Sequence, residues 1–316
     1  SVILSLSRTR IFRSILRQDM NMRILITGAT GFIGQLLVKS LRSDHELILV
    51  SRQPKLAAKQ LSVDNLKVIH INNLKNLNNV DVIINLAGES LAAKRWSEQQ
   101  KRVISESRWL ITEKLLSALK ASDEKQRVWI NASAIGYYGA QNAEPLSESF
   151  EPSTRDFPAR VCYHWEELAR QAQQYYCRVC IIRLGVVLGA SGGMLEKLIP
   201  IYHLGLGSRL GTGQQMLSWI TRDDVVHIIQ FLIQNNECKG VYNATTPHPV
   251  TQQQFSETLA RLLYRPHLLR TPGWILKILL GEMATLMLDG QNIQPARLQL
   301  AGYSFRYPEI HEALRH

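Results

Sequence analysis

The sequence predicts an α/β fold, a doubly wound parallel sheet followed by a second, smaller and mostly helical lobe. Three observations lead to this prediction. Short β-branched runs alternate with longer helical stretches from Met22 to about Gly189. Some runs, such as Val82 to Ile84, are apolar throughout, which indicates a sheet covered on both faces. After Gly189 the sequence becomes glycine-rich and mostly helical, as expected for a lobe outside the sheet.

The expected elements follow one another in a regular order. We expect strands at residues 23–27, 46–51, 68–71, 82–86, 128–132 and 179–184, and helices at 34–43, 98–119 and 159–174. Prolines divide the tail after residue 249 into short helices. We expect three regions: an N-terminal extension over residues 1–21, the sheet domain over 22–189, and the lobe with a small C-terminal domain over 190–316, of which part of 190–248 returns to the sheet.

Composition and charge exclude several classes of protein. The chain has 316 residues, of which 45% are hydrophobic and 20% charged, the balance of an ordinary globular protein. Its formal net charge is +11, without a cluster of basic residues. A nucleic-acid surface would cluster its lysines and arginines, so we expect no nucleic-acid partner. The charge favours an anionic small ligand or good solubility alone.

The four cysteines, at positions 162, 177, 180 and 238, are too few for a disulfide scaffold in a chain of this length. We therefore expect a reducing compartment. Cys177 and Cys180 form a Cys-x-x-Cys motif, which either zinc binding or core packing would explain. The pair runs into a strand-like stretch and has no second cysteine pair beside it. The sequence therefore favours core packing, and we expect no metal site.

Residues 1–21 are rich in arginine and serine and nearly free of acids, a composition typical of a transit peptide. The alternative, which we favour, is an upstream extension, with translation starting at Met20 or Met22. We expect a cytoplasmic protein, with the mitochondrial matrix or another organelle as the alternative. The apolar run 274–288 is too short to span a membrane and contains Lys277 and Glu282, so we expect no membrane partner.

A glycine-rich turn follows the first expected strand and opens the next helix. Its residues include Gly28, Thr30, Gly31, Phe32, Ile33 and Gly34. The first glycine allows a sharp turn, the second lets a pyrophosphate approach the backbone amides, and the third allows close packing of helix on strand. The phosphates then lie at a helix N-terminus, where free amides and the dipole favour anions. The order of strand, glycines and helix favours dinucleotide binding over a structural turn.

The end of the second expected strand indicates which dinucleotide binds. NAD sites usually carry an acid there, which bonds the ribose 2′-hydroxyl. This chain carries Ser51 and Arg52 instead, with Lys55 close behind. Because Arg52 can pair with a 2′-phosphate, we expect NADP as the cofactor. The alternative is that Arg52 is a solvated loop residue.

Short motifs recur in one fixed order across residues 22–314. They are Gly28 to Gly34, Asn85 to Glu89, Arg95-Trp96, Ser107-Arg108, Ser133 with Tyr138-Gly139, Trp165-Glu166, Arg183 to Gly189, Gly192-Gly193, Gly205 to Gly207, Trp219-Ile220, Asp223-Asp224 and Gly290-Gln291 with Pro295. On these motifs the chain resembles the extended short-chain dehydrogenase/reductase superfamily. It is most similar to the atypical epimerase family branch, short-chain dehydrogenase family 39U.

The resemblance implies a Rossmann domain that binds NADP and a small C-terminal domain characteristic of the branch. It places Ser51 and Arg52 on the adenosine phosphate. It also places five further positions at the cofactor: Leu86, Ala87 and Gly88 beside it, Arg108 on a phosphate and Val187 near the nicotinamide. Without the resemblance, Leu86 and Val187 would be interpreted as core residues and Arg108 as a solvated helix residue.

The catalytic pair of the superfamily, Tyr-x-x-x-Lys on one helix face, is missing. In that pair the lysine lowers the tyrosine pKa so that the phenol can pass a proton. No tyrosine of this chain has a lysine four residues on, and the usual spacing puts Pro158 and Cys162 near the two positions. Ser133 remains as a carbonyl-orienting hydroxyl, and Tyr163 or His164 as a substitute proton donor. Surface or packing roles are the alternative for these side chains.

Two functions fit the sequence. The first is an NADP-dependent oxidoreductase or epimerase-like enzyme that acts on a small polar carbonyl or sugar-type substrate. The second is a non-catalytic NADP(H)-binding protein that regulates or senses through a protein partner, which the missing pair favours. The retained Ser133 and the cofactor turn keep the first function ahead. A homodimer is compatible with either.

Overall fold

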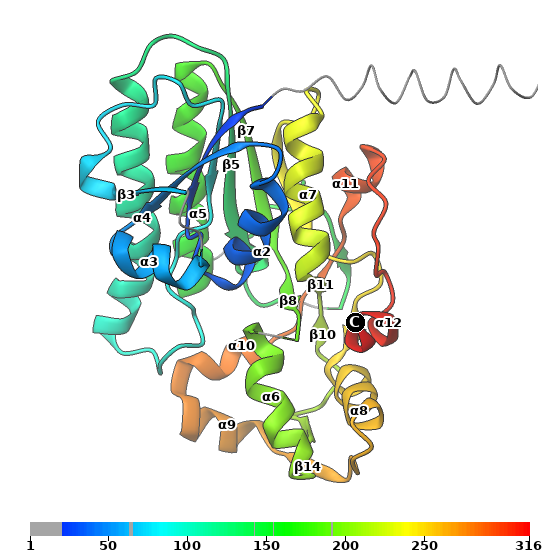
Figure 1. Cartoon of the computed structure of the whole chain (residues 1–316). Coiled ribbons are helices and arrows are strands. Elements are labelled where there is room, and N and C mark those ends of the chain that lie inside the picture. The colour runs from blue at the N-terminus through cyan, green and yellow to red at the C-terminus, as the bar shows by residue number, and fades with distance from the viewer. Residues whose placement is uncertain (1–20, 63–65, 142, 154, 191) are drawn as a thin grey trace, which may run out of the picture.

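The structure is a computed structural model that describes residues 21–62, 66–141, 143–153, 155–190 and 192–316. Its centre is a parallel sheet of seven strands in the order β12-β7-β5-β4-β1-β2-β3 (Figure 1). The strands are β1 (Arg23–Thr27), β2 (Glu46–Ser51), β3 (Lys67–His70), β4 (Val82–Asn85), β5 (Arg127–Ala134), β7 (Cys177–Leu184) and β12 (Gly240–Ala244). The chain passes from β1 to β2 and β3, then returns to β4 on the other side of β1. This reversal creates a crevice at the carboxyl ends of β1 and β4.

Helices cover both faces of this sheet, and the central strands are therefore apolar throughout. On one face, Leu37 of α2 (Phe32–Leu41) and Ile228 of α7 (Arg222–Gln234) pack in one core cluster with Ile24. On the other face, Leu115 of α4 (Glu98–Lys120) packs with Trp129, as does α5 (Phe157–Arg170). The short helix α3 (Pro54–Leu61) connects β2 to β3. Both layers are visible in Figure 1.

The lobe consists of short strand pairs and short helices. The pairs are β6 (Pro145–Leu146) with β15 (Asn292–Ile293), β8 (Val186–Leu188) with β11 (Trp219–Thr221), β9 (Ser208–Leu210) with β14 (Leu269–Thr271), and β10 (Met216–Leu217) with β13 (Val250–Thr251). The helices are α6 (Gly193–His203), α8 (Gln252–Leu262), α9 (Gly273–Leu280), α10 (Thr285–Leu288), α11 (Ala296–Leu300) and α12 (Ile310–Arg315).

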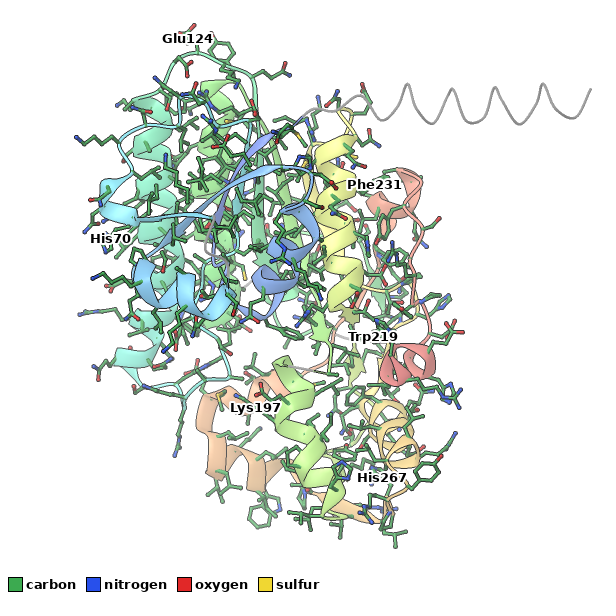
Figure 2. All side chains as sticks on the ribbon, in the orientation of Figure 1. His70, Glu124, Lys197, Trp219, Phe231 and His267 are labelled. Atoms are coloured by element: carbon green, nitrogen blue, oxygen red, sulfur yellow. The ribbon has the colours of Figure 1, made fainter. Side chains whose placement is uncertain are left out.

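The lobe has a core of its own and contacts the sheet domain through apolar side chains, such as Met283 packed with Trp96 and Phe157, and through polar groups. Trp219 is fully buried in a cluster with Tyr202 and Phe255, and Figure 2 shows it where the lobe meets the sheet domain. Lys197 on α6 donates a 2.6 Å hydrogen bond to the carbonyl of Ala92, in the loop after β4. The lobe therefore lies beside the carboxyl end of the sheet.

The fold class predicted from the sequence is confirmed, and several boundaries shift for local reasons. α2 begins at Phe32 rather than at residue 34, with Gly31 as its N-cap. α5 begins at Phe157 because the Asp156 carboxylate accepts a hydrogen bond from the Ala159 amide, and because Pro158 suits a first helical turn. Helix α3 and strand β12 are not among the elements expected from the periodicity.

Cys177 and Cys180 lie on opposite faces of β7. Cys177 packs in the core on the α4 side, and Cys180 packs on the side of α2 and α7. Residues three apart on a strand point to opposite faces, so the two thiols cannot converge on one ion, in agreement with core packing. Within the described ranges, no group of three or more metal-binding side chains is found and no helix could cross a membrane. The expected extension lies outside the described residues, apart from Asn21.

Candidate functional site

A row of buried polar side chains marks the carboxyl ends of three adjacent strands. Thr27, Asn85 and Asn131 are register partners on β1, β4 and β5. The Thr27 hydroxyl donates to Asn85 Oδ1 at 2.6 Å, and Asn85 Nδ2 donates to Asn131 Oδ1 at 2.8 Å. Because these buried groups are hydrogen-bonded to one another, the row fixes the spacing of the strand ends that bound the crevice.

The glycine turn after β1 leaves no room for a side chain at its first and last glycines. Gly28 has a φ of +73°, and a Cβ there would lie 2.6 Å from the carbonyl carbon of Leu86. A Cβ on Gly34 would lie 2.2 Å from the carbonyl oxygen of Gly28. The turn therefore packs directly on the end of β4. In the described part of the chain no side chain caps the N-terminus of α2, so its first amides are free to bind an anion.

A cleft of about 190 Å³ opens in front of this turn. Its walls come from the ends of β1, β2 and β4, together with α3 and α4, and consist of Thr27, Gly28, Ala29, Thr30, Gly31, Leu49, Val50, Ser51, Arg52, Ala57, Ile71, Leu86, Ala87, Gly88, Ser107 and Ile111. Eight of the predicted cofactor positions are thus brought together. Among the described residues no acidic side chain lines the cleft. Arg52 is exposed at its edge, and the Ser51 hydroxyl accepts a hydrogen bond from the Gln53 amide.

The remaining predicted cofactor residues lie behind or beside this cleft. The ring of Phe32 packs against Gly192, where a Cβ would lie 2.5 Å from it, and under the guanidinium of Arg222 at 4.8 Å. Ile33 packs on the core beside α2. Val187 is half-buried on β8, opposite the neighbouring strand β11. None of these three residues lines the cleft, and their contact with a cofactor stays a prediction.

Arg108 holds the loop that forms one wall of the cleft. Its guanidinium donates to the carbonyls of Ile104 and Glu89 at 2.8 and 2.9 Å. A Cβ on Gly88 would lie 2.9 Å from its central carbon, so the guanidinium packs directly on the cleft wall. Burial lowers the pKa of Arg108, while the nearby Cys162 and Glu89 raise it. The contact of this cation with a phosphate stays a prediction.

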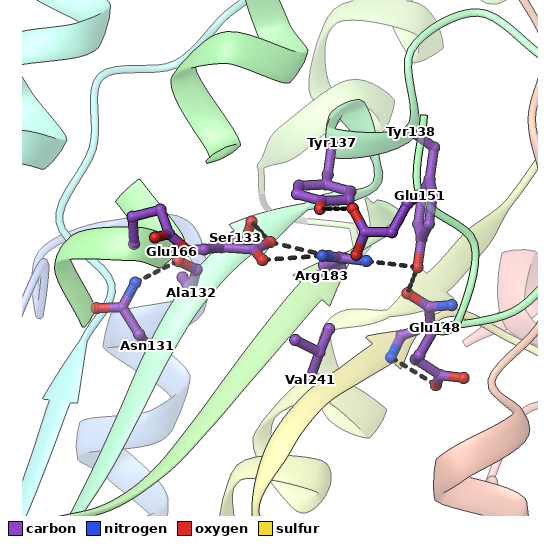
Figure 3. A network of polar contacts seen from close by, with 12 residues as sticks. Asn131, Ala132, Ser133, Tyr137, Tyr138, Glu148, Glu151, Glu166, Arg183 and Val241 are labelled. Atoms are coloured by element: carbon purple, nitrogen blue, oxygen red, sulfur yellow. Dashed lines mark hydrogen bonds and ion pairs between the residues drawn. The ribbon is translucent and has the colours of Figure 1, made fainter. Parts of the chain in front are cut away.

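Ser133 points into a buried polar network rather than into open space (Figure 3). Its hydroxyl donates a 2.7 Å hydrogen bond to Glu166 Oε1. The same carboxylate receives Arg183 through two hydrogen bonds, Nε to Oε1 at 2.8 Å and an Nη to Oε2 at 2.9 Å. Arg170 adds a fourth donor to Oε2 at 2.9 Å. The hydroxyl proton of Ser133 is therefore already engaged in a hydrogen bond to the buried carboxylate of Glu166.

Two tyrosines enclose the cation of this network. The guanidinium of Arg183 lies 3.4 Å from the ring centre of Tyr137 and donates to the Tyr138 hydroxyl, which in turn donates to Asn243 Oδ1. Burial, together with the hydrogen bond to Glu151, raises the pKa of Tyr137 to about 12. Burial raises the pKa of Tyr138 as well, although Arg183 counteracts it. Neither phenol is tuned to release a proton near neutral pH.

The two substitute donors lie on the outer face of α5. Tyr163 and His164 are both exposed. The Arg155 guanidinium lies 3.9 Å from the Tyr163 ring, and the His164 ring packs edge-on against Trp109. Cys162, near the position of the usual lysine, is buried next to Ser133, and burial raises its pKa to about 11. The structure does not bring either candidate donor to the cleft.

Sequence reasoning missed the residues that organise the network. Glu166 stands in the sequence as a motif residue without a derivable role, and its partner Arg183 is 17 residues further along the chain. The separate row of Thr27, Asn85 and Asn131 did leave a signal in the sequence: three polar residues at the ends of otherwise apolar runs. Such residues need buried partners, and their partners lie on neighbouring strands.

Comparison with known proteins adds a family context to this geometry. The model of the NAD dependent epimerase/dehydratase family matches residues 24–245. A domain of unknown function, DUF1731, matches residues 271–316. The two matches together cover the sheet domain and most of the lobe.

Relatives of similar length exist in plants and bacteria. The epimerase family protein SDR39U1 homolog, chloroplastic, from Arabidopsis thaliana is 38% identical over 306 residues, which cover 95% of this chain and 87% of that protein. The epimerase family protein SAR0825 from Staphylococcus aureus strain MRSA252 is 35% identical over 297 residues, covering 92% and 97%.

Solved structures show the same arrangement. The crystal structure of human epimerase family protein SDR39U1, isoform 2, with NADPH matches at a TM-score of 0.84 and 29% identity, covering 93% of this chain and 98% of that one. UDP-glucuronic acid 4-epimerase from Bacillus cereus, in complex with UDP-glucuronic acid and NAD, matches at 0.73 and 19% identity, covering 93% and 97%. At that identity the second match concerns the fold alone.

Proposed function

The chain belongs to the NAD dependent epimerase/dehydratase family, and from this premise we propose that it binds NADP(H) and acts as an oxidoreductase or epimerase-like enzyme. The substrate class that we propose is a small polar carbonyl or sugar-type compound. The observation that carries the proposal is the cleft at the ends of β1, β2 and β4. It is lined by the glycine turn and by Ser51 and Arg52, and none of the described residues that line it is acidic.

The described residues fit an NADP cofactor. The free amides at the start of α2 suit the pyrophosphate, and the glycine turn lets it approach because a Cβ at Gly28 or Gly34 would clash with backbone. Arg52 and Ser51 suit a 2′-phosphate, and Leu86 to Gly88 form the opposite wall. The human relative was solved with NADPH, which supports the same assignment. When bound, NADPH would supply the hydride.

The protein's own contribution to proton transfer is weak. Ser133 donates its hydrogen bond to Glu166, and both neighbouring tyrosines, Tyr137 and Tyr138, have raised pKa values. A positioned acid or base typically contributes about 10² to 10⁴ in rate. We therefore propose a slow enzyme, in which the chain binds and orients the substrate beside the cofactor.

A second candidate follows from the hydrogen bond between Ser133 and Glu166. A hydroxyl that serves a buried ion pair is a structural group, which favours a non-catalytic NADP(H)-binding protein acting through a protein partner. The four cysteines are free, buried thiols. This supports a reducing compartment such as the cytoplasm for either function.

The cofactor assignment is tested by titrating the purified protein with NADPH and NADH. Arg52→Ala should weaken NADPH binding by tenfold or more and leave NADH binding unchanged, because only NADPH carries the 2′-phosphate. Arg42→Ala, an exposed arginine outside the cofactor cleft, is the control. Equal losses for both nucleotides would contradict the assignment.

Turnover separates the two candidate functions. NADPH oxidation is followed with a panel of aldehydes, ketones and sugars, and isomer exchange in the sugars is followed separately. Turnover of any class above the rate without protein supports the enzyme. Tight NADPH binding without turnover of any compound supports the binding protein.

A further inference from the structure

One stretch of the lobe is both basic and apolar at the surface. Residues 261–280 contain four charged side chains, all cations and all exposed: Arg261, Arg265, Arg270 and Lys277. Six large apolar side chains of the same stretch are exposed as well: Tyr264, Leu268, Leu269, Trp274, Ile278 and Leu279. We refer to residues 261–280 as the basic apolar segment.

Most of the segment lies along the edge of the lobe that faces away from the sheet domain, whereas its last residue, Leu280, packs with Trp96 and Ile104. It runs from the end of α8 through β14 into α9, which Figure 1 shows along the lower edge of the molecule. β14 pairs with β9, where Ser208 is the register partner of Leu269. This pairing brings the exposed Leu204 and Leu206, just before β9, to the same end of the lobe.

Packing of the lobe does not account for the apolar residues. Trp274 and Ile278 lie one turn apart on one face of α9 and are 64% and 65% exposed, and Leu279 is 63% exposed. Only Leu276 of this helix is buried. Single exposed apolar residues are ordinary, but three large ones on one eight-residue helix, a tryptophan among them, indicate a contact surface.

The charges identify the class of partner. We propose that the basic apolar segment binds the surface of a membrane that contains anionic phospholipids. α9 would lie in the interface with Trp274 among the headgroups, while Arg265, Arg270 and Lys277 pair with phosphates. This binding requires no membrane span; it departs from the expectation of no membrane partner, which rested on the absence of a span. It is a property separate from the proposed reaction.

A second copy of the chain suits this surface poorly. A two-fold interface brings the same patch of both copies together. Four cations of one copy would then face four cations of the other, and no acid of the segment would balance them. The anionic lipid surface fits both the charge and the apolar residues.

Co-sedimentation with vesicles tests the proposal on the full chain. Vesicles of phosphatidylcholine alone are compared with vesicles that contain about one third phosphatidylglycerol. We expect binding to the anionic vesicles only, and release at about 0.5 M salt. The triple variant Arg265→Gln, Arg270→Gln and Lys277→Gln removes three positive charges and should lower the vesicle partition coefficient on the order of a hundredfold. The pair Trp274→Asn and Ile278→Asn should lower it by about tenfold or more.

Matched variants control for net charge and exposed area. Lys75→Gln, Lys120→Gln and Lys239→Gln remove the same charge from exposed sites elsewhere and should leave binding unchanged, as should Leu300→Asn, an 87% exposed leucine on α11. Equal binding to both vesicle types, or equal binding by the two triple variants, would overturn the proposal. A dimer in size-exclusion chromatography that the Trp274 variant dissociates would assign the surface to a second copy instead.

Discussion

The Ser133 hydroxyl and the Glu166 carboxylate are joined by a 2.7 Å hydrogen bond within the core, with both side chains almost fully buried. Ser133→Ala removes one of four donors from this anion. We expect a loss of about 1 to 2 kcal/mol in the free energy of unfolding and unchanged NADPH affinity. Urea unfolding and nucleotide titration measure the two quantities. Lower turnover without any loss of stability would instead assign the hydroxyl to the reaction.

A substitution at Glu166 should destabilise the fold far more than Ser133→Ala. Glu166→Gln leaves the buried cation of Arg183 without a counter-ion, which costs about 3 to 5 kcal/mol in the free energy of unfolding. Glu167→Gln is the matched control, because Glu167 is exposed and pairs with the same Arg170 at 2.5 Å. The control should cost less than about 1 kcal/mol. Similar losses for both variants would show that the buried ion pair of Glu166 and Arg183 contributes little to the free energy of unfolding.

Substitution of the two adjacent aspartates at the start of α7, Asp223 and Asp224, should change the stability of the fold by different amounts. Asp224 is buried and accepts hydrogen bonds from the Tyr303 hydroxyl and from the amides of Arg306 and Tyr307, which attach the C-terminal tail to the helix. Asp224→Asn turns one acceptor into a donor that faces other donors. A loss of about 2 to 3 kcal/mol is expected in chemical denaturation. Asp223→Asn, on the half-exposed neighbour, should leave stability within about 0.5 kcal/mol.

The glycine turn offers a steric test of the cofactor site. An alanine at Gly34 would place its Cβ 2.2 Å from the Gly28 carbonyl oxygen, so the turn must open and NADPH binding should be lost. Gly273→Ala is the control, since its Cβ would meet Leu288 at an ordinary 3.4 Å. Fluorescence titration with NADPH compares the two variants. Retained affinity in Gly34→Ala would argue against this turn as the pyrophosphate site.

Stability should fall on the alkaline side. Burial raises the pKa of Cys162 from 9 to about 11, and burial with the Glu151 contact raises that of Tyr137 from 10 to about 12. The folded state thus holds protons that the unfolded state releases. Their contribution is fully present below pH 9 to 10 and is lost as the pH rises through 11 and 12. Urea unfolding across this range should show the decline, and Tyr137→Phe should reduce its slope above pH 10.

The sequence predicts the central sheet well because its signal is local. The apolar run Val82 to Ile84 identifies β4, and the glycines after Thr27 identify the switch between β1 and α2. The family resemblance drawn from ordered motifs is confirmed by a match over residues 24–245. These features depend on neighbours in the chain, and periodicity detects such features.

The features that the sequence did not predict depend on distant partners. The sequence led us to expect that part of residues 190–248 returns to the sheet, but not which part: β12 has only five residues, Gly240 to Ala244, and becomes a strand because β7 provides its ladder. Glu166 and Arg183 lie on different elements, and nothing in their local sequence indicates that they form a buried ion pair. Tyr138 and Asn243 bond across 105 positions of the chain. Such pairings are set by topology and not by propensity.

The place of β12 in the sheet has a consequence for how the protein is made. Gly240 to Ala244 pair with Cys180 to Leu184 at one edge of the sheet, so that edge stays open until the ribosome has released residue 244. Until then β7 presents unpaired amides and carbonyls, a template for the wrong strand of another nascent chain. Chaperone demand should therefore be greatest during synthesis of the lobe, and a gene truncated after residue 189 should yield inclusion bodies rather than a smaller nucleotide-binding protein.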